Sequence, residues 1–104
     1  MEKQYHKLVR DRIPEIIEGQ GRACRVEVLS EAAYLEKLEQ KLHEELAEYE
    51  ESGQVEELAD LLEVIAAAAE ARGCTWQQLL AIREEKRNAR GGFEKRLLLL
   101  EVTE

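Results

Sequence analysis

The chain has 104 residues, which suits a single domain, and it carries a formal net charge of -8 with a pI near 4.9. A chain this acidic is a poor ligand for nucleic acid phosphates, so no nucleic acid polymer is expected as a partner. Hydrophobic residues make up 44% and charged residues 37% of the chain. This composition is typical of a globular protein rich in amphipathic helix and excludes a disordered one.

The two cysteines, Cys24 and Cys74, lie far apart and form no C-x-x-C pattern. A disulfide framework or a zinc site is therefore not expected. The N-terminus shows no apolar segment of the secretory type, and the longest strongly apolar run, residues 64–69, is too short to cross a bilayer. We expect reduced thiols, no membrane association and a cytoplasmic location.

The first expected elements are a short helix and a short strand. Pro14 fits the first turn of a helix within residues 7–18, where its missing N–H group is not needed. Residues 24–29 alternate briefly and are rich in valine, which predicts a strand. The expected partner is a second strand at about residues 96–102, so the fold would include a minor two-stranded β element.

Two long helices follow. Ser30 caps the first, at about residues 31–51, and the second is expected at about residues 54–72. Gly53 lies in the short break between them. Because the break is so short, the two helices are expected to form an antiparallel hairpin.

A fourth helix is expected at about residues 76–90, where Thr75 and Gln78 form a capping box. The predicted fold is all-α, a single domain over residues 1–104 with a helical bundle built on the hairpin. One copy supplies too few long helices for a four-helix arrangement. A second copy would complete it, so we expect a homodimer or a higher homo-oligomer.

Both long helices carry an apolar stripe that is expected to face the core. On the first helix the stripe consists of Leu35, Leu38, Leu42, Leu46 and Tyr49. On the second helix the main stripe consists of Val55, Leu58, Leu62, Ile65 and Ala69. The second helix also has another apolar face of small residues, formed by Leu61, Val64, Ala67, Ala68 and Ala71. A helix with two apolar faces is expected to pack on both of them.

Acidic residues of the hairpin follow the pattern E-E-x-x-E at residues 44–48 and E-x-x-D at residues 57–60. Since a helix turns about 100° per residue, Glu45 lies about 60° from the centre of the first apolar stripe. Glu57 and Asp60 begin the small apolar face of the second helix. Acids so close to apolar faces need a cation or protons to neutralise them.

The acids of each pair, Glu45 with Glu48 and Glu57 with Asp60, are three residues apart and therefore neighbours on their helix. A hairpin can bring the two pairs together, and Mg²⁺ or Mn²⁺ prefers such clusters of carboxylate oxygens. The competing interpretation is a chance pattern, since the chain contains 23 Asp and Glu residues.

This acidic pattern resembles that of the MazG-like all-α nucleoside triphosphate pyrophosphohydrolases. The sequences K-L-V-R-D-R-I-P-E at residues 7–15 and R-G-G-F at residues 90–93 resemble a small phosphoribosyl-ATP-pyrophosphohydrolase-like branch, so the likeness extends over nearly the whole chain. It implies cleavage between the α- and β-phosphates, which yields a nucleoside monophosphate and pyrophosphate. It also implies a set of Mg²⁺ ligands, namely Glu45, Glu48, Glu57 and Asp60.

The resemblance further implies that Glu44 ligates the metal or positions water. Bound metal would neutralise charge in the transition state and make water a better nucleophile. A carboxylate that the metal does not saturate can accept the proton of that water. Glu44 and Glu45 are the candidates for this general base.

Several basic residues are candidates for binding the substrate phosphates. Lys41 lies on the acidic flank, as a phosphate ligand or as a salt-bridge partner. Arg83, Lys86 and Arg90 recur at helical spacing, which fits a phosphate clamp or a solvated cationic face near a helix C-terminus. For the cations of the N-terminal turn, surface ion pairing is favoured over a phosphate contact. Trp76 is interpreted as an anchor at a helix start or as a base-stacking platform.

Three other functions compete with the pyrophosphohydrolase. A non-catalytic regulator would bind nucleotide or metal at the same site without turnover. A di-iron carboxylate protein needs Glu-x-x-His on two helices, but Gln40 stands three residues before His43. A helical hairpin used only for dimerisation would gain nothing from metal.

Overall fold

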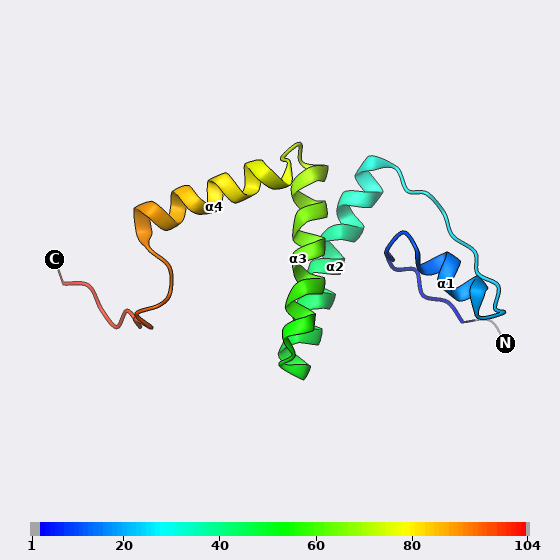
Figure 1. Cartoon of the computed structure of the whole chain (residues 1–104), viewed down its shortest axis with the longest axis horizontal. Coiled ribbons are helices and arrows are strands. Elements are labelled where there is room, and N and C mark those ends of the chain that lie inside the picture. The colour runs from blue at the N-terminus through cyan, green and yellow to red at the C-terminus, as the bar shows by residue number, and fades with distance from the viewer. Residues whose placement is uncertain (1–2, 104) are drawn as a thin grey trace.

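The computed structural model describes residues 3–103 and shows four α-helices among them (Figure 1). They are α1 (Ile13–Gly19), α2 (Glu31–Ser52), α3 (Val55–Ala71) and α4 (Trp76–Arg90). The expected all-α class is confirmed, and the three longer helices begin and end within about a residue of their predicted limits. Within the described residues, no helix has the length and apolar content needed to cross a bilayer.

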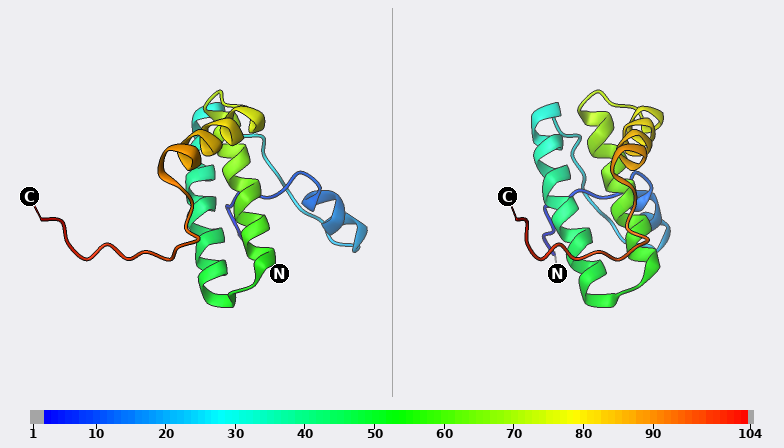
Figure 2. Two further views of the ribbon diagram at one scale, coloured as in Figure 1. Left: turned by 60° about the vertical axis from the view of Figure 1, so that its left-hand side comes forward. Right: turned by 90° about the vertical axis from the view of Figure 1, so that its left-hand side faces the viewer.

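Helices α2 and α3 lie side by side as an antiparallel hairpin (Figures 1 and 2). At the start of α2, the Ser30 side chain accepts a hydrogen bond from the Ala33 N–H over 3.2 Å. Gly53 ends the helix with φ +67°, and its N–H donates to the Tyr49 carbonyl over 2.8 Å. Glycine adopts this left-handed backbone at little cost, so it allows α3 to turn back along α2.

The core of the described chain lies along the seam between α2 and α3. Leu38 on α2 is 1% exposed and Val64 on α3 is 8% exposed. Glu45 stands seven residues after Leu38, on the same face of α2, and it is only 7% exposed. A carboxylate therefore occupies a position in this seam that an apolar core residue would normally take.

The prediction that the main apolar stripe of α3 faces the core is wrong for most of its length. Val55, Leu58, Leu62 and Ile65 are between 37% and 74% exposed. The face that packs against α2 is the small apolar one, whose residues Leu61, Ala67 and Ala68 are partly buried and whose Val64 is buried. Small side chains let two helices approach closely, so the alanine-rich face is the better partner for α2.

The minor β element is absent from the described part of the chain. Residues 24–29 and 96–102 contain no strand, and they lie on opposite sides of the molecule (Figure 1). A strand is stable only when a neighbour pairs with its backbone N–H and C=O groups. Local valine content is therefore not enough, because the helices separate these two segments.

Helix α4 meets the end of α3 and then projects away from the hairpin (Figures 1 and 2). It begins at the predicted capping box, in which Thr75 and Gln78 exchange side-chain and backbone hydrogen bonds. The radius of gyration is 18.3 Å, whereas a compact domain of this length has about 13 Å. A single copy is therefore open and leaves much of its apolar surface in water.

Candidate metal centre

Carboxylates from α2 and α3 converge in the half of the hairpin that is nearer to its turn. One group, Glu44, Glu45 and Glu48, comes from α2, and a second group joins Glu45 to Glu57 and Asp60 of α3. Within each group, one carboxylate oxygen of every residue lies within 4.8 Å of the others. Glu45 belongs to both groups and links them. We call these five residues the acidic cluster.

The local sequence explains why these side chains meet. Glu45 and Glu48 lie on one flank of α2, and Glu57 and Asp60 stand in the first two turns of α3. The turn at Gly53 places the end of α2 beside the start of α3. The N-terminal end of a helix carries partial positive charge, which helps to stabilise the two acids of α3.

Glu45 is the buried member of the acidic cluster. Its Oε1 atom lies 3.5 Å from Nζ of Lys41, whereas its Oε2 atom is buried and has no hydrogen-bond partner within residues 3–103. Burial raises the pKa of Glu45, and the adjacent Glu48 carboxylate raises it further, while Lys41 opposes both effects. Buried polar atoms nearly always have a partner. The free Oε2 atom is therefore a position where a cation or a proton can bind.

Glu57 also has a raised pKa. The first cause is partial loss of hydration, followed by the negative charges of Glu48, Asp60 and Glu56. These like charges come from both helices of the hairpin. They show that the acidic cluster resists full ionisation unless a positive charge is added.

Cations already surround part of the acidic cluster. Oε1 of Glu44 lies 3.2 Å from Nζ of Lys7 and 3.3 Å from Nζ of Lys41. Burial acts to raise the pKa of Glu44, but these two lysines outweigh it and the pKa is lowered. On the other helix, Nη2 of Arg10 donates a hydrogen bond to Oδ1 of Asp60 over 2.8 Å.

Sequence reasoning expected surface ion pairs for the N-terminal cations, but it missed that their partners are residues of the acidic cluster. Lys7 is 37 residues from Glu44, and Arg10 is 50 residues from Asp60. Periodicity within one helix has no information about contacts over such separations. The long-range position of the N-terminal segment could therefore be found only in the folded chain.

The other expected phosphate-binding residues are divided between two places. Lys41 lies within the acidic cluster, in contact with Glu44 and Glu45. Arg83, Lys86 and Arg90 lie exposed on α4, and none of them forms an ion pair with the acidic cluster among the described residues. A single copy therefore assembles Lys41, but not the basic residues of α4, beside the acids.

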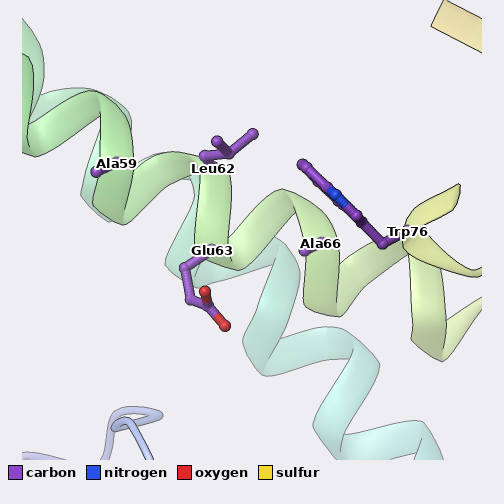
Figure 3. Close-up of a pocket in the computed structure, with 5 residues that line it drawn as sticks. All are labelled: Ala59, Leu62, Glu63, Ala66 and Trp76. Carbon is purple, nitrogen blue, oxygen red and sulfur yellow. The ribbon is translucent and has the colours of Figure 1, made fainter. Parts of the chain in front are cut away.

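Trp76 lines a shallow hollow on the outer side of α3 (Figure 3). Four residues of α3 form the remainder of this hollow, namely Ala59, Leu62, Glu63 and Ala66. None of the five belongs to the acidic cluster. The indole ring lies along α3 at the start of α4 (Figure 3), a position that fits the expected anchor role.

Comparisons with known proteins provide little guidance on function. No protein-family profile matches the chain, and no solved structure matches it. An uncharacterised protein of Mycolicibacterium smegmatis (strain ATCC 700084 / mc(2)155) is 50% identical to the chain over 42 residues. This match spans 40% of the chain and 43% of that relative, which is less than half of either protein. The residues of the acidic cluster are therefore the basis on which a function can be inferred.

The donor chemistry of the acidic cluster fits a metal ion. Its ligands are all carboxylate oxygens, which hard divalent cations prefer. Glu45, the residue that the two groups share, has a buried oxygen that no described hydrogen-bond donor satisfies. A divalent ion there would neutralise the like charges that raise the pKa values of Glu45 and Glu57.

Proposed function

We propose that the chain is a Mg²⁺-dependent nucleotide pyrophosphohydrolase related to the MazG-like enzymes. It would cleave a nucleoside triphosphate, or a phosphoribosyl-ATP-like nucleotide, between the α- and β-phosphates to give a monophosphate and pyrophosphate. Removal of non-standard nucleotides in the cytoplasm is the role that we infer for it. The observation that carries the proposal is that Glu45, the residue shared by two convergent carboxylate groups, has a buried oxygen without a hydrogen-bond partner among the described residues.

Four residues would hold Mg²⁺, or Mn²⁺ in its place, and they are Glu45, Glu48, Glu57 and Asp60. The bound ion would supply charge neutralisation and a more acidic water molecule. Mg²⁺ keeps several of its own waters, so it does not need every carboxylate at once. Lys41, whose Nζ atom lies 3.3 Å from Glu44 and 3.5 Å from Glu45, would contact the substrate phosphates.

The general base is either Glu44 or Glu45, and the pKa directions in the metal-free chain favour Glu45. Two lysines hold Glu44 in its ionised form and lower its pKa, which makes it a weak proton acceptor. Burial and the Glu48 carboxylate raise the pKa of Glu45 instead. A group with a raised pKa is the better acceptor for a proton from water, so Glu45 would act as the base through an oxygen that the metal does not engage.

The test is an assay of pyrophosphate release from a panel of nucleotides in the presence of Mg²⁺ or Mn²⁺. Substitution Glu57→Gln should reduce release by at least about 100-fold, as expected for a direct metal ligand. Glu56→Gln is the matched control, because Glu56 is the adjacent acid of α3 but lies outside the acidic cluster. Circular dichroism should show equal helix content in both variants. Absence of pyrophosphate with every nucleotide and metal would refute the proposal.

A non-catalytic nucleotide- or metal-binding regulator is the alternative. One observation favours it, namely that Arg83, Lys86 and Arg90 lie on α4 and form no ion pair with the acidic cluster among the described residues. Isothermal titration calorimetry with Mg²⁺ and nucleotide, run beside the product assay, separates the two functions. Binding without any product supports the regulator.

We propose in addition that the working unit is a homodimer or a higher homo-oligomer. The exposed stripe of α3, formed by Leu58, Leu62 and Ile65, is an apolar helix face without a partner among the described residues. The open shape of one copy leaves room for a second hairpin against this stripe. Two hairpins packed in this way would form the expected four-helix arrangement.

A further inference from the structure

Residues 3–12 precede α1 and lie against the hairpin without forming a helix. Polar contacts hold this segment in place. Nζ of Lys37 donates to the His6 carbonyl over 3.3 Å, while Lys7 and Arg10 contact Glu44 and Asp60. The N-terminal segment therefore brings two cations to the acidic cluster, one to each helix of the hairpin.

These two ion pairs are well placed to exchange partners. The side chains of Lys7 and Arg10 are 46% and 58% exposed. Exposed ion pairs contribute little to stability because water screens them. Because neither side chain is buried against the hairpin, each cation can leave its carboxylate without disrupting the core.

We propose that Lys7 and Arg10 are polyphosphate ligands that act as counter-ions while the site is empty. Without metal, they neutralise Glu44 and Asp60. With metal bound, they turn to the phosphate oxygens of a metal-bound nucleotide. The identity of that polyphosphate as a nucleotide rests on the proposed function, whereas the exchange itself rests on the two contacts.

The physical reason for the exchange is competition between positive charges. A divalent cation on Asp60 repels the Arg10 guanidinium that occupies the same carboxylate. The phosphates that accompany the metal bring several negative oxygens to the same place. A guanidinium binds phosphate through two parallel hydrogen bonds, and an ammonium binds it as a point charge. Each cation therefore gains a stronger partner than the one it leaves.

The first measurement is the affinity for Mn²⁺ in the absence of nucleotide, by isothermal titration calorimetry. Lys7→Gln and Arg10→Gln each remove a competing cation, so Mn²⁺ should bind about two- to five-fold more tightly. Arg12→Gln is the matched control, because Arg12 is a cation of the same segment that pairs with Glu15 at 3.7 Å instead of with the acidic cluster. The control should bind Mn²⁺ like the parent chain.

The second measurement uses inorganic pyrophosphate as the probe, with Mn²⁺ at saturation. Here Lys7→Gln and Arg10→Gln should each weaken binding by roughly ten-fold, because a charge-assisted hydrogen bond is lost. Arg10→Lys keeps the charge and should recover part of this loss. The variants thus shift two affinities in opposite directions, which a merely structural role of the segment would not do.

An unchanged or weaker affinity for Mn²⁺ in both variants would overturn the inference, and so would unchanged binding of pyrophosphate. The binding measurements can fail independently of the hydrolysis assay, so the two proposals can be distinguished. If no nucleotide is hydrolysed but the two affinities shift as described, the exchange stands and the chain is a polyphosphate-binding protein. If hydrolysis occurs and the affinities do not shift, only the role of Lys7 and Arg10 is lost.

Discussion

At the scale of single residues, Glu45 combines two opposing effects. Its position in the seam between α2 and α3 removes it from water, and its Oε2 atom has no hydrogen-bond partner. This arrangement lowers the stability of the metal-free fold. The same arrangement supplies a buried donor for a cation. A buried carboxylate with a perturbed pKa at a site of convergent charge is typical of a functional position.

Replacing Glu45 by leucine should therefore stabilise the metal-free protein and abolish its metal binding. Leucine continues the seam that Leu38 begins, and we expect a gain of about 1 kcal/mol. For a domain of this size such a gain raises Tm by about 4–8 °C. Thermal unfolding followed by circular dichroism measures it. Glu36→Leu, at an exposed position of the same helix, should change stability little, and an equal gain there would contradict the explanation.

The raised pKa values of Glu45 and Glu57 predict how the metal-free protein responds to pH. Above their ordinary value of 4.5, the folded chain keeps protons that the unfolded chain has released. The free energy of unfolding should therefore fall as pH rises above 4.5. Glu44 acts in the opposite sense, because its lowered pKa makes stability rise as pH approaches 4.5 from below.

Denaturant titrations from about pH 4 to about pH 7 would measure this dependence. Saturating Mn²⁺ should reverse the decline above 4.5, because the metal binds only deprotonated ligands. Glu45→Leu should reduce the decline in the metal-free protein. A flat profile in the parent chain would contradict the assigned pKa directions.

At the scale of elements, the turn at Gly53 determines whether the acids of α2 meet those of α3. Gly53 has φ +67°, and a Cβ atom added there would meet nothing within 4 Å. A larger residue at this position would meet no steric clash. It would be disfavoured only because residues other than glycine rarely adopt a positive φ. The turn depends on glycine for its left-handed geometry alone.

Gly53→Ala should lower the free energy of unfolding by about 1 kcal/mol, with a matching fall in Tm. Gly53→Asn should lower the free energy of unfolding by less than Gly53→Ala does, since asparagine tolerates the left-handed conformation better than alanine. Gly19→Ala is the control, because Gly19 ends α1 without a positive φ and also has open space around it. Thermal unfolding of the three variants gives the comparison. Equal losses at both glycines would show that the backbone conformation of Gly53 is unimportant.

Helix α3 presents two apolar faces, and only one of them is covered. The alanine-rich face packs on α2 and begins with Glu57 and Asp60, so packing the hairpin also places these acids in the cluster. The larger stripe with Leu58 and Leu62 is left exposed. The element therefore has one face that carries the acids and a separate exposed face that the proposed second copy would cover.

At the scale of the whole molecule, one copy buries little of its apolar surface. Among the described residues, Leu38 and Val64 are the buried hydrophobic ones, and four consecutive leucines at 97–100 are 79–85% exposed. The proposed assembly of two or more copies would remove part of this apolar surface from water. This arrangement is expected of a protomer whose core is completed on assembly.

The double substitution of Leu58 and Leu62 by glutamate should therefore weaken self-association. Each leucine that is buried in the dimer contributes about 1.5–3 kcal/mol, so the dissociation constant should rise by at least about ten-fold. Sedimentation velocity over a range of concentrations measures it. Val28→Glu is the control, since Val28 is 98% exposed on a non-helical segment. A parent chain that stays monomeric at every concentration would refute the dimer.

Much of the fold follows from local signals. Ser30 and the pair Thr75 and Gln78 start helices where the sequence predicted them, because a cap acts within a few residues. The acidic cluster was also predictable, since Glu45 and Glu48 share one helix and a short turn joins it to the next. The prediction of a β element was wrong because strand pairing depends on long-range contacts, and residues 24–29 lie far from residues 96–102 in the fold.

The sequence by itself determined the helices, their caps, the turn at Gly53 and the acids on the hairpin, because each depends on interactions between near neighbours in the chain. Only the tertiary structure decided which face of α3 packs on α2, since two apolar faces compete for one partner and size decides between them. It alone placed Lys7 on Glu44 and Arg10 on Asp60. Those contacts join residues 37 and 50 positions apart, and no local periodicity encodes them.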